Sequence, residues 1–453
     1  MTHRKPPSRL ANAVAGLGAQ VFSSLNSFLI IIISARFLEL GVHGHFVFGV
    51  ALCQIVLSLV RALCGETVVV LSTRGDDTTD DAAFSSAIVA SAIGGVVCLL
   101  TAIFWAEYRS ALIATAFVGI PVCAMDVLRY CAIADKRSEL LLFSDFLVFV
   151  GTTVGLLVVG QVAASPSAFL AVWGVSCLLV SILLVWQLDI RPVSFRTTLD
   201  WLAINFPRSS AFFAEAALGA TAGVAILAVM AIVTDSEQVS IFRTALTIMG
   251  VTSLINNFMR STVLRELSPD LLRNKTYVIR VFFGMTAVVT LVIVVFGLCI
   301  WLAPNGLTAA IFGANFVAIV PVLLPAIIHR VCASCSTIPT IFLRAQGITW
   351  QATRFRFVVV AIGIIVGPFG AYLGGAHGAL IGDMITYLTL FVGLSALVMY
   401  TANKQAVVFA AITGNGMLSV ISRDTSVKSL ADLKGKKLTV AGQGGTPDYM
   451  IRY

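Results

Sequence analysis

The sequence predicts an all-α polytopic membrane protein, with about twelve transmembrane helices in two six-helix lobes related by pseudo-two-fold symmetry. Of its 453 residues, 58% are hydrophobic and only 11% are charged, and the mean hydropathy is +0.97. Soluble domains carry about 25% charged residues. Apolar stretches long enough to cross a bilayer recur from Asn12 to Thr401. This composition excludes a soluble enzyme, a disordered protein and a nucleic-acid binder that works through an exposed basic patch.

The apolar stretches define the predicted spans in chain order. Each is bounded by a polar or glycine-rich connection, and the first follows a basic N-terminus without a clear cleavage site, so we expect it to be retained. The twelve predicted spans are 12–38, 43–71, 83–105, 111–134, 140–161, 166–188, 208–233, 239–264, 277–302, 315–343, 350–372 and 376–401.

Lysine and arginine alternate between the two sets of connections. One set contains only Arg36 and Arg109, whereas 161–165 and 303–314 within it contain neither residue type. Basic loops stay in the cytoplasm, so both termini are predicted to lie there. The net charge of +8 is therefore explained by membrane topology and does not indicate nucleic-acid binding. The basic set comprises Arg4, Lys5, Arg9, Lys136, Arg137, Arg191, Arg196, Arg265, Arg273, Lys275, Arg354 and Arg356.

The two halves of the chain look alike at one junction. ARFLELGVHGHFVFGVAL (35–52) joins spans one and two, and VMAIVTDSEQVSIFRTAL (229–246) joins spans seven and eight. Phe48, Ala51 and Leu52 recur 194 positions later as an identical set. Internal repeats with a binding site at their interface are typical of transporters. We therefore expect an N-terminal lobe at 1–188, a cytoplasmic linker at 189–207, a C-terminal lobe at 208–402 and a polar tail at 403–453.

Small and polar residues form stripes at helical spacing in spans one, two, seven and eight. Close helix packing through small residues is one explanation, but it does not account for charged members, which cost several kcal/mol in a bilayer unless they face a cavity or a partner. The stripes are Asn12, Gly16, Ala19, Ser23 and Ser27; Gln54, Ser58, Arg61 and Gly65; Glu215, Gly219, Ala222 and Gly223; and Arg243, Thr247, Gly250, Ser253 and Asn257, with Arg260 at the edge.

Further charges lie inside the predicted spans. His329 and Arg330 are nearest the midplane, in a span that carries three prolines and is therefore expected to bend near the pair. Asp126 and Arg129 have the spacing of an intrahelical ion pair, and charges nearer a helix end can instead extend to the interface. The gating or coupling candidates are Glu66, Asp126, Glu215 and Asp383.

The sequence indicates neither a cofactor nor a metal site. All nine cysteines fall in apolar stretches and are expected to be small buried hydrophobic residues. His329, Cys332 and Cys335 are spaced like a metal or redox site, but they lie in an apolar helix, which argues against that reading. No motif of a hydrolase, phosphotransferase or metalloprotease is found, so an enzyme is not expected.

Four segments resemble polysaccharide and oligosaccharide-lipid flippases of the MOP (MATE-like) superfamily over residues 1–402. The first is 35–52, quoted above, which is similar to their junction of helices one and two. DSEQVSIFRTALTI (235–248) is similar to their helix 7–8 junction, and IFGANFVAIVPVLLPAI (311–327) to the entry into helix ten. GPFGAYLGGAHGALIGDMI (367–385) is similar to the turn before their last helix.

This resemblance implies a bacterial inner-membrane protein that moves a polyprenyl-pyrophosphate-linked oligosaccharide by alternating access. Its partners would be the lipid-linked glycan, the bilayer and glycan polymerase or ligase machinery, with no nucleic acid. Helices one, two, seven and eight would line the cavity. A pyrophosphate in a low-dielectric cavity needs cationic partners, which arginine supplies with planar donors. The substrate-binding candidates are Gln54, Arg61, Arg243, Asn257, Arg260, His329 and Arg330.

Two other functions stay open. A cation-coupled small-molecule antiporter of the MATE branch needs a titratable acid in its cavity, and Glu215 and Asp383 could serve. A non-transporting membrane scaffold would not need arginines that face a cavity. Sequence alone names neither the glycan nor the coupling ion.

The tail follows a different pattern. SVKSLADLKGKKLTVAGQGGTPDYMIRY (426–453) resembles the early part of periplasmic substrate-binding proteins of the nitrate, sulfonate or thiamine-precursor type. It covers only a small part of such a domain and would lie on the cytoplasmic side. We therefore expect a truncated fusion or gene-boundary fragment rather than a working ligand site, forming at most a short unit with little packing.

The predicted topology has a direct test. Cysteines introduced into 161–165 and 303–314 of a cysteine-free variant are expected to react with a membrane-impermeant maleimide added to intact cells, because both connections lie outside. Cysteines introduced into 135–137 should react only after permeabilisation. Protection of both outer connections in intact cells would contradict the topology.

Overall fold

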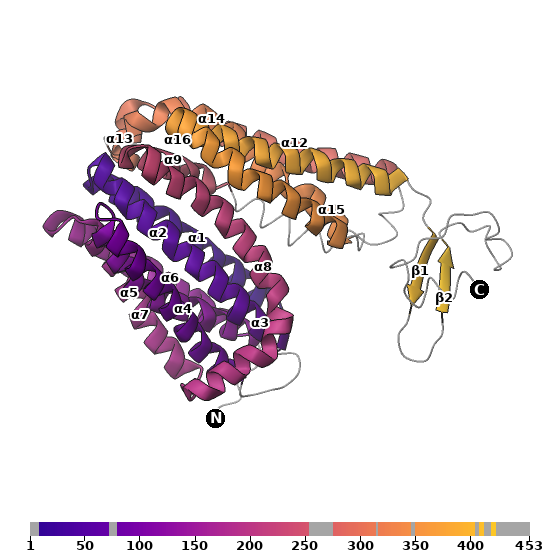
Figure 1. Cartoon of the computed structure of the whole chain (residues 1–453), viewed down its shortest axis with the longest axis horizontal. Helices are drawn as coiled ribbons and strands as arrows, with labels where there is room; N and C mark the ends of the chain where they lie inside the picture. The colour runs from indigo at the N-terminus through magenta and orange to yellow at the C-terminus, as the bar shows by residue number, and fades with distance from the viewer. Residues whose placement is uncertain are drawn as a thin grey trace.

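The computed structural model is an all-α polytopic membrane protein with one small β-hairpin, as the sequence predicts for its helical part. It describes residues 9–71, 79–252, 275–313, 316–345, 349–403, 407–411 and 418–422. The helical segments from α1 to α7 form an N-lobe, and the helices from α8 onward form a C-lobe (Figure 1). The two lobes converge at the end that carries α13 and diverge towards the other end.

The N-lobe follows the predicted spans closely. Its second span is interrupted by a π-helix, η1, which the sequence did not predict. The elements are α1 (Arg9–Phe37), α2 (Leu40–Val60), η1 (Arg61–Gly65), α3 (Glu66–Leu71), α4 (Thr79–Phe104), α5 (Arg109–Ala134), α6 (Ser138–Val162) and α7 (Pro166–Gln187).

The C-lobe begins earlier than predicted. Ser194 caps α8 by accepting a hydrogen bond from the backbone N–H of Thr197 at 3.2 Å. The second part of the predicted linker 189–207 is therefore helical and continuous with span seven. The elements are α8 (Phe195–Val233), α9 (Ser236–Gly250), α12 (Lys275–Trp301), α13 (Asn305–Phe312), α14 (Phe316–Cys335), α15 (Thr337–Ala345) and α16 (Thr349–Asn403).

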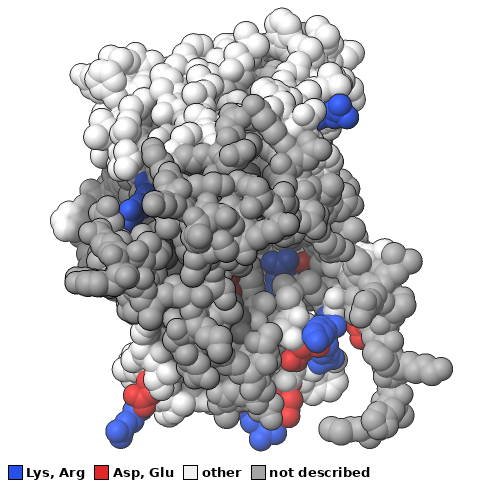
Figure 2. Space-filling model, turned by 90° about the vertical axis from the view of Figure 1, so that its right-hand side faces the viewer, with Lys and Arg blue, Asp and Glu red and all other residues white. Residues whose placement is uncertain are grey.

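Ten helical stretches of the described residues are long and apolar enough to cross a membrane. The last of them, Gln351–Thr401, contains the two final predicted crossings, because the backbone leaves helical geometry at Gly374 and Gly375. The eighth predicted span is described only as far as Thr252, and its remainder lies outside the described residues. Charged side chains gather at the lower end of the face in Figure 2, whereas its upper part is almost free of colour.

Glycine makes the turn inside α16 possible. Gly375 has a φ of +55°, a conformation that side chains with a Cβ rarely adopt. The two arms then pack backbone to backbone, because a Cβ on Gly370 or Gly378 would collide with the carbonyl group of the other. The glycines of this run, Gly370, Gly374, Gly378 and Gly382, thus lie at a tight turn and at the close packing of its two arms.

The bend in span ten lies elsewhere than predicted. The helix ends at Cys335 and resumes at Thr337, so the break is at Ser336 and not beside His329 and Arg330. Pro339 explains the position, because proline has no N–H to donate to the carbonyl of Cys335 four residues earlier. Pro321 and Pro325 stay inside α14.

The described part of the tail is a two-stranded antiparallel hairpin. β1 (Val407–Ala411) pairs with β2 (Leu418–Ser422), with Phe409 opposite Val420. Figure 1 shows it apart from the helices. The segment that resembles a binding protein, 426–453, lies outside the described residues, so its predicted nature stays a prediction.

The glycine packing in α16 can be tested by substitution. Gly378→Ala is expected to lower the thermal unfolding temperature in detergent, at a cost of about 1–3 kcal/mol, because the new methyl group forces the two arms apart. Gly284→Ala on α12 is the matched control, since no atom lies within 4 Å of its added Cβ. Equal melting temperatures for both variants would contradict the packing.

Candidate functional site

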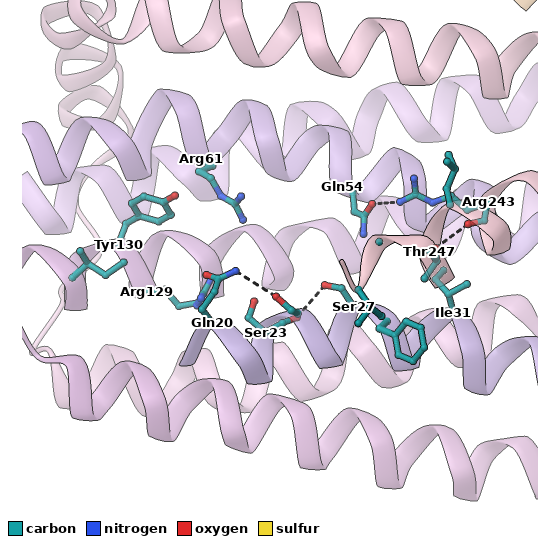
Figure 3. A pocket seen from close by; sticks show the side chains of 16 residues that line it. Gln20, Ser23, Ser27, Ile31, Gln54, Arg61, Arg129, Tyr130, Arg243 and Thr247 are labelled. Carbon is teal, nitrogen blue, oxygen red and sulfur yellow. Dashed lines mark hydrogen bonds between the residues drawn. The ribbon is translucent and has the colours of Figure 1, made fainter. Parts of the chain in front are cut away.

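A cavity of about 510 Å³ lies between the two lobes. Side chains from α1, α2, η1, α5 and α9 line it (Figure 3). Its position agrees with the expectation that stripes from the two halves face one another. The lining residues are Gln20, Ser23, Ser24, Ser27, Phe28, Ile31, Gln54, Arg61, Arg129, Tyr130, Ile133, Arg243, Leu246, Thr247, Gly250 and Val251.

The α1 wall of the cavity is polar and uncharged. Gln20 donates to the hydroxyl of Ser24 at 3.4 Å, and the hydroxyl of Ser27 donates to the carbonyl of Ser23 at 3.2 Å. These residues recur every three or four positions, so they share one face of the helix. Hydroxyl and amide groups both donate and accept hydrogen bonds, which suits them to neutral polar ligands.

Arg61 stands at the start of the π-helix in the second span. The N–H of Glu66 bonds to the carbonyl of Arg61, five residues back, which is the wider turn of a π-helix. Gly65 allows Tyr130 of α5 to approach, because a Cβ there would lie 2.9 Å from its ring. Single π-turns inside α-helices occur frequently at functional sites.

The guanidinium of Arg61 is held by Asp126 of α5. Its Nε donates to Oδ2 and its Nη2 to Oδ1, both at 2.8 Å. This is a bidentate, charge-assisted pair, the strongest type of side-chain hydrogen bonding. The side chain of Arg61 is 35% exposed, towards the cavity, whereas that of Asp126 is 6% exposed.

Asp126 has a second arginine partner. Arg129 donates from Nη1 to Oδ1 of Asp126 at 3.2 Å, the expected i,i+3 pair, and from Nη2 to Oδ2 of Asp145 on α6 at 2.9 Å. Arg61, Asp126, Arg129 and Asp145 thus form a chain of alternating charge, which we call the four-charge chain. It is neutral in total, so Arg61 brings no net charge to the cavity. Removing one member of such a buried set costs about 3–5 kcal/mol.

Arg243 of α9 lies in a different environment. Its Nη2 donates to Oε1 of Gln54 on α2, and Thr247 bonds to its backbone carbonyl at 2.8 Å. Its Nε has no hydrogen-bond partner in the described part of the chain. Arg61 and Arg129 also line the cavity, but both are paired with carboxylates, whereas the described side-chain partner of Arg243 is neutral. The charge of Arg243 is therefore available to a ligand.

The predicted midplane pair lies deeper in the C-lobe, outside the cavity lining. His329 Nε2 is 2.8 Å from Oδ2 of Asp383 on α16, and the ring of Tyr387 lies edge-on at 5.4 Å. Arg330 donates from Nε to the hydroxyl of Thr252 at 3.0 Å, just beyond α9. The structure therefore separates His329 and Asp383 from Gln54, Arg61 and Arg243.

Other predicted candidates need correction or lie outside the description. Span seven was expected to line the cavity, but none of its described residues does, and α5 takes that place with Arg129 and Tyr130. The reason is that α8 packs against α16 and α2. Asn257 and Arg260 lie outside the described residues, and the side chain of Glu215 is not described. Glu66 is half-buried at the start of α3.

One end of the cavity is closed by contacts between the lobes. A Cβ on Gly44 of α2 would collide with the backbone carbonyl of Ser236 at the start of α9. Fully buried His43 lies 3.2 Å from the Ile31 carbonyl through Nε2 and 2.7 Å from the Ser240 hydroxyl through Nδ1. Because a carbonyl only accepts, Nε2 is the donor, and Nδ1 of the neutral ring accepts from Ser240.

These closing residues were not singled out from the sequence. Gly44 and His43 lie in the repeated junction 35–52, so the repeat marked the right segment without showing which side chains meet. A histidine at the first position of the predicted span 43–71 was the available signal.

The comparisons with known proteins bear on the fold. No protein-family model matches the chain, and no curated protein sequence does. Several solved structures are similar. An inward-facing multidrug resistance MATE transporter of the MOP superfamily aligns over 84% of this chain and 96% of its own, with a TM-score of 0.63 and 12% identity.

Two further structures agree. A MATE structure in the straight conformation aligns over 87% of this chain and 96% of its own, with a TM-score of 0.53 and 12% identity. The lipid II flippase MurJ in an inward closed conformation aligns over 87% and 90%, with the same TM-score and identity. The chain has the fold of MOP-superfamily transporters.

The closed end gives a prediction. Gly44→Val is expected to part the lobes there, because the side chain has no room against the Ser236 backbone. A cysteine at Thr247, inside the cavity, should then react faster with an impermeant maleimide added outside intact cells. Gly16→Val, whose added Cβ meets no atom within 4 Å, is the control. An unchanged reaction rate for Gly44→Val would contradict the closure.

Proposed function

We propose that this protein is a flippase that moves a polyprenyl-pyrophosphate-linked oligosaccharide across the bacterial inner membrane for cell-surface polysaccharide synthesis. The observation that carries the proposal is Arg243. It places a guanidinium with a neutral partner in a cavity that is also lined by hydroxyl and amide groups of α1. An arginine in this setting favours an anion, and the wall favours sugar hydroxyls.

The cargo's three parts match three environments. The pyrophosphate carries charge that must be paired when it leaves water, and Arg243 supplies a partner inside the cavity. Sugars adjoining it can exchange hydrogen bonds with Gln20, Ser23 and Ser27. The polyprenyl chain stays in the bilayer, so its apolar surface is not transferred into water.

The direction of transport follows from the predicted topology. With both termini in the cytoplasm, the closed end at Gly44 and Ser236 is the outer end, and the cavity accepts cargo from the cytoplasmic side. Alternating access then requires the lobes to part at that end and to meet at the other. The fold shared with a lipid II flippase supports this movement, and the cavity chemistry supports the cargo. Glycan polymerase or ligase machinery would consume the product.

The second candidate function is a cation-coupled antiporter of the MATE branch. The pairing of His329 with Asp383 favours it, because it places a titratable acid inside the C-lobe, although the pair does not line the cavity described above. An organic cation as cargo is disfavoured, since Asp126 and Asp145 are neutralised by arginines and Arg243 would repel it. A scaffold without transport gives no reason to bury Arg243 in a cavity.

Arg243→Gln tests the proposed function. In a strain that lacks its own flippase, the wild-type protein is expected to restore glycan export, and the variant to lose at least roughly tenfold, the value of a charge-assisted hydrogen bond. Arg191→Gln, an exposed arginine outside the cavity, should export normally at equal membrane levels. Full export by Arg243→Gln would refute the anionic cargo.

A further inference from the structure

Arg61 belongs to two sites at once. It lines the cavity, with 35% of its side chain exposed, and the Nε–Nη2 edge of its guanidinium is paired with the buried carboxylate of Asp126. An anion in the cavity gains this bidentate edge, and the charge that Asp126 compensates, only by taking Arg61 from Asp126. The carboxylate is therefore a competitor built into the protein.

The structure also gives Asp126 a second partner that remains when Arg61 moves to a ligand. Asp126 keeps a hydrogen bond from Arg129 at 3.2 Å, and Arg129 in turn keeps Asp145 at 2.9 Å. A buried carboxylate left without any partner would be strongly unfavourable. Because Arg129 stands behind it, Asp126 can release Arg61 without being orphaned.

We propose that Asp126 is a specificity-determining residue that competes with the cargo's pyrophosphate for Arg61. In the empty cavity Arg61 is paired with Asp126; in the loaded cavity it turns to the anion while Arg129 holds Asp126. This inference rests on the proposed function and names how that site selects and releases its cargo.

The competition selects for the number of charges on the ligand. Exchanging one carboxylate for one phosphate oxygen at Arg61 replaces a charge-assisted pair with a similar one, so a small monoanion gains little. A pyrophosphate carries more charge, so it gains by recruiting Arg61 in addition to Arg243, since both arginines line the cavity. The same competition shortens the time that the anion stays bound, because Asp126 pairs with Arg61 again as the anion departs.

Asp126→Asn removes the competitor and is expected to tighten anion binding roughly tenfold, the worth of a charge-assisted hydrogen bond. Purified protein in lipid nanodiscs is titrated with farnesyl pyrophosphate and, separately, with inorganic pyrophosphate. Turnover in the export assay should fall, since tighter binding slows release. Glu107→Gln makes the same change of charge in the same lobe, at the His45 pair outside the cavity, and should leave affinity unchanged.

A second substitution shows whether Asp126 acts through Arg61. Adding Arg61→Gln to Asp126→Asn should abolish the tenfold gain, because the competed guanidinium is gone. A gain that persists without Arg61 would reflect long-range charge and would overturn the proposal.

A charge-neutral variant tests the supporting pair and does not depend on the stability of Asp126→Asn. Arg129→Gln with Asp145→Asn leaves Asp126 with Arg61 as its one partner in the four-charge chain, so releasing Arg61 becomes costly. Anion affinity is expected to fall roughly tenfold while the net charge stays the same. Unchanged or tighter binding by this double variant would overturn the proposal.

The two probes separate this inference from the proposed function. If inorganic pyrophosphate responds to Asp126→Asn but farnesyl pyrophosphate does not bind, the competition stands and the lipid-linked cargo fails. If both probes bind and neither responds, the cargo stands and the competition fails. If neither probe binds the wild-type protein, both are overturned.

Discussion

The carboxylate of Asp126 is the group on which the N-lobe depends. It accepts hydrogen bonds from Arg61 on the second span and from Arg129 on α5, and Arg129 also donates to Asp145 on α6. An unpaired charge is costly in a low-dielectric interior, so these four side chains stabilise one another. Their pairing fixes the position of three spans around one side of the cavity. It also explains why a cavity with several arginines is less positive than their number suggests.

The C-lobe manages its charges differently. His329 and Asp383 pair inside the lobe, whereas Arg330 and Arg243 bond to the neutral side chains of Thr252 and Gln54. The neutral partners leave both guanidinium charges uncompensated by these contacts. The two lobes are therefore unequal in chemistry, because one carries its charges as closed pairs and the other presents a cation. A ligand between the lobes meets the cation Arg243 of the C-lobe. From the N-lobe it gains a second cation, Arg61, only when Asp126 releases that arginine.

Much of the fold was predictable because the bilayer restricts each span to a long apolar helix. The spans, the turn at Gly374–Gly375 and the polar faces containing Gln54, Arg61 and Arg243 follow from hydropathy and helical periodicity. Periodicity gives the face of a helix but not its neighbour. For that reason periodicity could not predict that Arg61 meets Asp126, 65 residues away, or that α5 replaces span seven at the cavity. The π-helix at Arg61 was equally hidden, since it depends on how closely Tyr130 approaches Gly65.

The distribution of contacts bears on how such a molecule can move. The ion pairs of the four-charge chain lie within the N-lobe, and the pair of His329 with Asp383 lies within the C-lobe. The described contacts between α2 and α9, which join the lobes beside the cavity, pair no opposite charges: Ser236 packs on Gly44, Ser240 donates to His43, and Arg243 donates to an amide. Separating opposite charges in a low-dielectric medium costs far more than exchanging neutral hydrogen bonds. The lobes can therefore part at these contacts without breaking the ion pairs of the four-charge chain or the pair of His329 with Asp383, which is the mechanical condition that the proposed alternating access requires.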